Sequence, residues 1–180
     1  MNISNSGIFE EFSNNPFDEK LSEGLVSLFK GNTVIDLGCG CEALYVKYLR
    51  QNNIECYGID GYKKVIENQF CSCFSLEKVL YLSKVYDYVL SLEVGEHIPE
   101  EYENIFINNI HKLNSKGVVI SWGIEGQIGE GHVNCKSNEY IKRKFLQLGY
   151  KIDLENEIYL RSLCKIKWLK ESLMVFKKWN

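Results

Sequence analysis

The segment VIDLGCGCEAL, residues 34–44, joins an apolar run to a carboxylate and a glycine turn. Gly38 and Gly40 satisfy the spacing G-x-G-x-x-G/A of a dinucleotide-binding turn, and Asp60 stands 20 residues after Gly40, where an acid that binds a ribose is expected. Asp36 discriminates between possible ligands. A pyrophosphate would lie beside this fixed negative charge, whereas a cofactor with an ammonium or other cationic group would be attracted to it. The segment therefore favours a cationic cofactor over a dinucleotide.

Two further segments carry side chains that could act as a general base. Glu96 and His97 follow the apolar run YDYVLSLE, and His132 lies in the glycine-rich segment GIEGQIGEGHVN. An imidazole with a reference pKa of about 6.5 suits proton removal at neutral pH, and the glycines would let the His132 loop close over an acceptor. Alternatively, His132 and Asn134 only fix this loop by hydrogen bonding. For His97, capping or packing at a helix start is the favoured interpretation.

Short apolar runs alternate with helical patterns along the chain, which predicts a parallel sheet with helices on both faces. The expected strands are 33–37, 54–60, 86–93 and 117–122, and the expected helices are 42–51, 99–113 and 138–148. Because open α/β sheets bind ligands at the carboxyl ends of their strands, the candidate residues are expected to gather at that edge.

Both ends of the chain add elements to this core. An N-terminal helix is expected with Asn15 as its cap and Pro16 in its first turn. Its apolar stripe comprises Phe17, Leu21, Leu25 and Leu28. After residue 149, the segments YKIDLENEI and ESLMVFKK are interpreted as two further strands, with an irregular stretch between them.

The composition is typical of a single globular domain, residues 1–180. The apolar fraction is 45% and the charged fraction 25%, which is ordinary for a protein with a packed core. The N-terminal residues lack the pattern of a secretion signal, and no uncharged run approaches the roughly 18 residues of a membrane helix. We therefore expect a cytoplasmic protein without a membrane partner; its oligomeric state is left open.

The cysteines and the charge pattern exclude other classes. Seven cysteines, an odd number without a secretion signal, indicate reduced thiols, and the C-x-C pairs lack the spacing of a zinc site, so no metal is predicted. Residues 136–180 hold 11 Lys and Arg against 5 Asp and Glu. These charges are interleaved with core-like residues, which favours a solvated face over a nucleic-acid surface.

Three motifs in order resemble one known family. VIDLGCG, then an acid at the end of the next strand in YGID, then YDYVLSLEVGEHIPEEYENIF are similar to the class I S-adenosylmethionine-dependent methyltransferases. The form E-x-x-E-H-I-P is common among their small-molecule and sugar methyltransferases. The resemblance spans roughly residues 33–176 and implies a Rossmann-like, seven-stranded, mostly parallel sheet that ends in an antiparallel hairpin.

The resemblance also implies a set of cofactor contacts. Gly38, Cys39 and Gly40 would pass under the methionine part of S-adenosylmethionine, Asp36 would act on its ammonium group, and Asp60 would accept the ribose hydroxyls. The remaining expected contacts are Gly61, Phe74, Ser75, Leu92, Glu93 and Val94. Two departures from the family pattern are Glu42 in the place of a third glycine and the lack of an acid in the adenine loop CSCFS.

The expected activity is methyl transfer to a hydroxyl of a small molecule, sugar or glycan, with His132, Glu96 and His97 as catalytic candidates. Residues 1–32 would form a helical cover over the cofactor site. Two alternatives stay open: a module that binds S-adenosylmethionine without catalysis, and a methyltransferase acting on nitrogen of a protein or small molecule. A dehydrogenase is disfavoured by Asp36.

Overall fold

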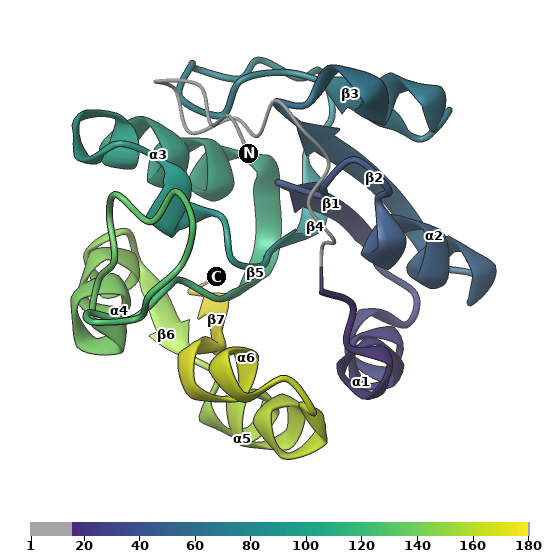
Figure 1. Ribbon diagram of the computed structural model, residues 1–180. Coiled ribbons are helices and arrows are strands. Elements are labelled where there is room, and N and C mark those ends of the chain that lie inside the picture. Colours follow the sequence, from purple (N-terminus) through teal and green to yellow (C-terminus); the bar gives the residue numbers. More distant parts are fainter. Residues whose placement is uncertain (1–15, 180) are drawn as a thin grey trace.

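The computed structural model describes residues 16–179, which form a seven-stranded sheet flanked by helices (Figure 1). The strand order is β3-β2-β1-β4-β5-β7-β6, and β7 runs in the direction opposite to the other six strands. The strands are β1 (Thr33–Leu37), β2 (Glu55–Asp60), β3 (Cys71–Cys73), β4 (Tyr86–Ser91), β5 (Asn114–Ile120), β6 (Tyr150–Ile152) and β7 (Met174–Lys178). The expected Rossmann-like sheet with an antiparallel C-terminal hairpin is confirmed.

Helices cover both faces of the sheet. One apolar cluster buries residues of α1, α2, α5 and α6, and a second buries residues of α3 and α4 on the opposite face (Figure 1). The α-helices are α1 (Glu19–Phe29), α2 (Leu44–Gln51), α3 (Glu103–Leu113), α4 (Asn138–Gln147), α5 (Leu154–Leu163) and α6 (Lys167–Ser172). Three short 3-10 helices are η1 (Lys63–Glu67), η2 (Gly95–His97) and η3 (Glu100–Tyr102).

The chain order reverses at β1 and β4, and this reversal defines the ligand-binding edge. From β1 the chain continues into α2 on one face, while from β4 it continues into α3 on the other. The loops after these two neighbouring strands therefore separate and leave a crevice at their carboxyl ends. Both strands are almost entirely buried, so this edge is anchored in the core.

The segment between β6 and β7 corrects the sequence prediction. YKIDLENEI was expected to be one strand, but the strand ends at Ile152 and α5 begins at Leu154. Asp153 caps this helix by accepting a hydrogen bond from the backbone N–H of Asn156. The stretch expected to be irregular, residues 159–170, is also mostly helical, as the end of α5 and the start of α6, and the final strand begins at Met174. An edge strand, β3, also occupies the first part of the predicted loop CSCFSLE.

The N-terminal helix is present but begins later than predicted. Asp18, and not Asn15, caps α1, because its carboxylate accepts a hydrogen bond from the N–H of Leu21 at 3.1 Å. The predicted stripe packs as expected, with Leu21 and Leu25 fully buried. Residues 1–15 lie outside the described residues, so the proposed cover of the cofactor site by residues 1–32 stays a prediction. None of the described helices is both long and apolar enough to cross a membrane.

Asp18 also binds the connection between α5 and α6. Its second carboxylate oxygen accepts hydrogen bonds from the N–H groups of Lys165 and Ile166, at 2.6 and 2.9 Å, so it ties α1 to the connection between α5 and α6. We predict that Asp18→Ala lowers the free energy of unfolding by about 2–4 kcal/mol, because a cap is lost and two N–H groups lose their partner. Urea unfolding measures the change.

Glu19→Ala is the matched control for this substitution. Glu19 is exposed in the same first turn and contributes only its interaction with the helix dipole, so we expect a loss below about 1 kcal/mol. Equal losses for the two variants would show that Asp18 does not tie the two segments together.

Candidate functional site

The turn after β1 requires glycine at its first position. Gly38 has a φ of +86°, and a Cβ added there would lie 2.3 Å from a methyl carbon of Val94. Any larger residue would therefore collide with the loop after β4 as well as strain the backbone. Glu42 stands where the family pattern has a third glycine, and the left-handed residue at the start of α2 is its neighbour Ala43, with a φ of +48°.

Asp36 is a buried carboxylate without a cation of the protein's own. It is 3% exposed, and no described residue forms an ion pair or hydrogen bond with its carboxylate. Burial, together with the neighbouring Cys71 and Asp60, raises the pKa of Asp36 well above its usual range. A ligand that brings positive charge to this position would relieve the repulsion and keep Asp36 ionised.

Asp60 is oriented by the backbone at the end of β2. One carboxylate oxygen accepts a hydrogen bond from the N–H of Gly40, and the other accepts one from the N–H of Tyr62, both at 2.8 Å. Because a carboxylate has about four acceptor positions, each oxygen keeps one for a further donor. Burial raises the pKa of Asp60, and these two hydrogen bonds oppose that shift. The residue is thus positioned to accept two hydroxyl groups of one ligand.

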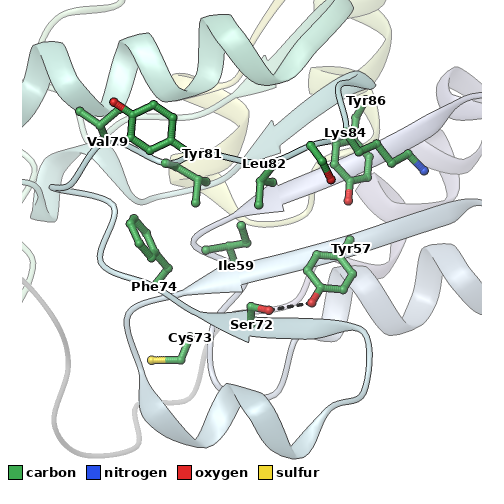
Figure 2. A pocket seen from close by; sticks show the side chains of 12 residues that line it. Tyr57, Ile59, Ser72, Cys73, Phe74, Val79, Tyr81, Leu82, Lys84 and Tyr86 are labelled. Carbon is green, nitrogen blue, oxygen red and sulfur yellow. Dashed lines mark hydrogen bonds between the residues drawn. The ribbon is translucent and has the colours of Figure 1, made fainter.

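A pocket of about 430 Å³ lies beside the edge of the sheet formed by β2 and β3 (Figure 2). Phe74, predicted to flank the adenine, forms part of its wall together with Ile59 and Leu82. The irregular segment 74–85 bounds the pocket where a connecting helix between β3 and β4 could have packed. Across the floor, the hydroxyls of Tyr57 and Ser72 are hydrogen-bonded at 2.7 Å.

The other predicted cofactor contacts also follow directly after strands. Cys39 comes after β1, Gly61 after β2, Ser75 after β3, and Leu92, Glu93 and Val94 after β4. The thiol of Cys39 itself turns inward: a Cβ placed on Gly58 would lie 2.7 Å from the sulfur of Cys39 and 2.8 Å from that of Cys71. These buried thiols form part of the core, and the contact of each residue with cofactor stays a prediction.

Glu93 occupies a strained position at the end of β4. Its φ is +54°, in the left-handed region that glycine favours. Its backbone N–H donates to the hydroxyl of Ser121, and its carboxylate accepts from the side chains of Gln127 and Ser172 at 3.2 and 3.1 Å. Sequence reasoning missed Gln127 and Ser172, since the first lies in an irregular loop and the second in a predicted strand.

The three predicted catalytic residues lie together. One ligand atom each of Glu96, His97 and His132 falls within 4.8 Å of the other two. The two imidazole rings meet edge to face, with centroids 5.0 Å apart. Glu96 and His97 come from η2 after β4, and His132 comes from the loop after β5, so two loops far apart in sequence build one cluster. Whether His97 has a structural or a catalytic role stays a prediction.

Backbone hydrogen bonds hold the two loops together. The carbonyl of Glu96 accepts from the N–H groups of Val133 and Asn134, at 2.8 and 2.9 Å. The Asn134 carbonyl in turn accepts from the ring N–H of the fully buried Trp122 at 2.7 Å. Asn134 thus fixes the loop, as one of the sequence alternatives proposed, and by doing so it places His132 beside η2.

Burial sets the charges of the cluster. It raises the pKa of Glu96 well above its usual range, with a further contribution from the negative charge of Glu93. Burial also lowers the pKa of His97 to about 4, so its imidazole is neutral at neutral pH. A neutral imidazole next to a carboxyl group can accept a proton or donate an electron pair to a ligand.

The glycine turn, the paired acids at the ends of β1 and β2, and the strand order together define a Rossmann-like methyltransferase fold. The sequence profile of the methyltransferase domain family matches residues 9–122, and the chain belongs to this family. It is an S-adenosylmethionine-dependent methyltransferase. The residues present fit that cofactor, because Asp36 lacks a cation and Asp60 offers acceptor positions.

Solved structures share the fold at low sequence identity. The magnesium protoporphyrin IX methyltransferase of Synechocystis, crystallised with S-adenosylhomocysteine, is 16% identical with a TM-score of 0.66, over 94% of this chain and 90% of that one. A TehB-like methyltransferase of Corynebacterium glutamicum is 16% identical with a TM-score of 0.65, over 93% and 90%. The cyclase SpnF is 14% identical with a TM-score of 0.62, over 96% and 86%. No curated protein sequence matches the chain.

We predict that Asp60→Ala weakens binding of S-adenosylhomocysteine by about tenfold to a hundredfold, because charge-assisted hydrogen bonds to the ligand are lost. Isothermal titration calorimetry measures the affinity. Glu55→Ala is the matched control, because Glu55 is exposed at the opposite end of the same strand and its loss leaves the site intact. Unchanged affinity in Asp60→Ala would remove Asp60 from the cofactor site.

Proposed function

We propose that the enzyme transfers a methyl group to a hydroxyl oxygen of a small molecule, a sugar hydroxyl included. The observation that carries this proposal is the cluster of Glu96, His97 and His132 at the carboxyl ends of β4 and β5. Glu96 follows two residues after Val94, which packs on the glycine turn, so the cluster lies on the side of the crevice where an acceptor can approach.

The chemistry of oxygen acceptors explains why such a cluster is useful. S-adenosylmethionine supplies a methyl group on a sulfonium, which is already an excellent leaving group. The acceptor oxygen uses a lone pair to form the new O–C bond, while the electron pair of the C–S bond passes to sulfur. The hydroxyl proton must leave as well, and His132, which is partly exposed in its loop, is placed to receive it. A neutral amine has less need of such a base.

The size of the connecting segments supports a small acceptor. Within residues 16–179, the connections between strands hold only short helices and loops, and none adds a further domain to grip a macromolecule. Basic residues of the C-terminal segment form ion pairs within the fold: Lys142 pairs with Glu157 at 2.8 Å, and Lys144 pairs with Glu103 at 3.1 Å. These contacts favour the solvated, structural role over nucleic-acid binding.

The proposal is tested with methyl-labelled cofactor and a panel of hydroxyl, amine and peptide acceptors. We expect O-methylated products, and we expect His132→Ala to lower kcat by about 10²–10⁴-fold, because the proton loses its acceptor. The affinity for S-adenosylhomocysteine should not change.

Glu125→Ala serves as the control, because Glu125 is exposed in the same loop and outside the cluster. Turnover of amines or peptides with no hydroxyl compound methylated would contradict the oxygen assignment.

A further inference from the structure

We propose that Glu96, His97 and His132 bind one divalent transition-metal ion at the carboxyl ends of β4 and β5. The cysteine spacing alone led to the expectation that the chain holds no metal, and this inference revises it. Binding of the ion does not depend on the proposed acceptor. Its role in methyl transfer does rest on that proposed function.

The geometry of the cluster suits one ion. Its three ligand atoms already lie within 4.8 Å of one another. An ion about 2.0–2.2 Å from each nitrogen and oxygen requires ligand separations of roughly 3–3.5 Å, which small side-chain rotations would reach. Because Glu96 and His97 are adjacent in η2 and His132 is held by the bonds from Glu96 to Val133 and Asn134, these rotations need no rearrangement of the loops.

The carboxyl group of Glu96 provides an independent observation. Its side chain is 0% exposed, and neither oxygen has a hydrogen-bond partner in the structure. A bound cation satisfies the buried oxygens and the charge at once.

Backbone carbonyls fix the tautomer of both imidazole rings. Nδ1 of His97 lies 3.0 Å from the carbonyl oxygen of Gly131, and Nδ1 of His132 lies 3.2 Å from that of Gln127. A carbonyl only accepts hydrogen bonds, so each Nδ1 carries the proton and each Nε2 carries the lone pair. Backbone carbonyls that fix the tautomer in this way are the common outer contacts of metal-binding histidines.

The ligand set selects the kind of ion. Two imidazoles and one carboxylate suit Mn²⁺, Fe²⁺, Co²⁺ or Zn²⁺, whereas Mg²⁺ and Ca²⁺ prefer oxygen ligands alone. Glu93 adds a nearby negative charge, held in place by Gln127 and Ser172. The sulfur of Cys135 lies 3.5 Å from Nδ1 of His132, on the protonated side of the ring, and is therefore not a ligand.

In catalysis the ion would act on the acceptor. A hydroxyl oxygen bound to it becomes more acidic, so the ion would take over the role proposed above for His132 as the base, and the proton would pass to solvent water at neutral pH. The oxygen then forms the O–C bond as the C–S bond breaks toward sulfur. No electron is gained or lost by the metal in this reaction, which explains why a redox-inactive ion would suffice.

Electron paramagnetic resonance of Mn²⁺ added to the purified, chelator-treated full chain tests the site, because this ion binds poorly to the seven thiols. We expect one bound Mn²⁺ per chain. Glu96→Gln and His132→Ala should each weaken this binding by about tenfold or more, since each removes one ligand. His111→Asn is the matched control, because His111 lies on α3, where it contacts Tyr150, and is outside the cluster.

Thermal unfolding distinguishes a loss of metal binding from a folding defect in the variants. Glu96→Gln keeps the side-chain volume, so its melting temperature without metal should equal or exceed that of the wild type, while added Mn²⁺ should raise only the wild-type value. No bound Mn²⁺ in the wild type, or equal binding in all variants, would overturn the metal site. Methyl transfer that persists under a chelator would overturn its catalytic role and leave the proposed function standing. Mn²⁺ binding without any O-methylation would support the site and contradict the proposed function.

Discussion

The structure depends on one constraint: carboxylates are buried at one edge of the sheet with no cationic side chain of residues 16–179 beside them. Elsewhere the chain pairs such groups with lysines: Asp153 with Lys177 and Glu157 with Lys142, both at 2.8 Å. Among residues 16–179 neither Asp36 nor Glu96 has a lysine or arginine partner, and the pKa of each is raised. Burying an unpaired charge costs several kcal/mol, so these positions are expected to bind ligands that bring positive charge. In the proposed site, the cofactor would provide one such charge and the metal ion the other.

The loop after β4 couples these two positions. Val94 packs so closely on the turn after β1 that only glycine fits at residue 38. One residue later, Gly95 lies against the ring of Trp122, where an added Cβ would be 2.2 Å from a ring carbon. Trp122 also anchors the loop that carries His132 through its bond to Asn134. A single short segment therefore positions both the glycine turn and the cluster.

Sequence patterns could predict the sheet because its central strands are continuous apolar runs that end in acids or glycines. They failed at α5, where YKIDLENEI alternates like a strand. In the helix Leu154 is exposed, and the buried face includes Glu157, whose charge is met by Lys142 from α4. A tertiary ion pair of this kind leaves no periodic apolar signal. Individual site residues could be named from motifs, but the meeting of His132 with Glu96 depends on backbone bonds that the residue types do not encode.

Crystals grown with S-adenosylhomocysteine and Mn²⁺ offer the most direct measurement, because anomalous diffraction at the manganese edge locates the metal while the density locates the cofactor product. We predict an anomalous peak bonded to Glu96, His97 and His132, with the ammonium group of the ligand beside Asp36. The contradicting result would be bound S-adenosylhomocysteine with no manganese peak in the cluster and with Glu96 still lacking a partner. Such a structure would show that cations do not bind at both of these buried carboxylates.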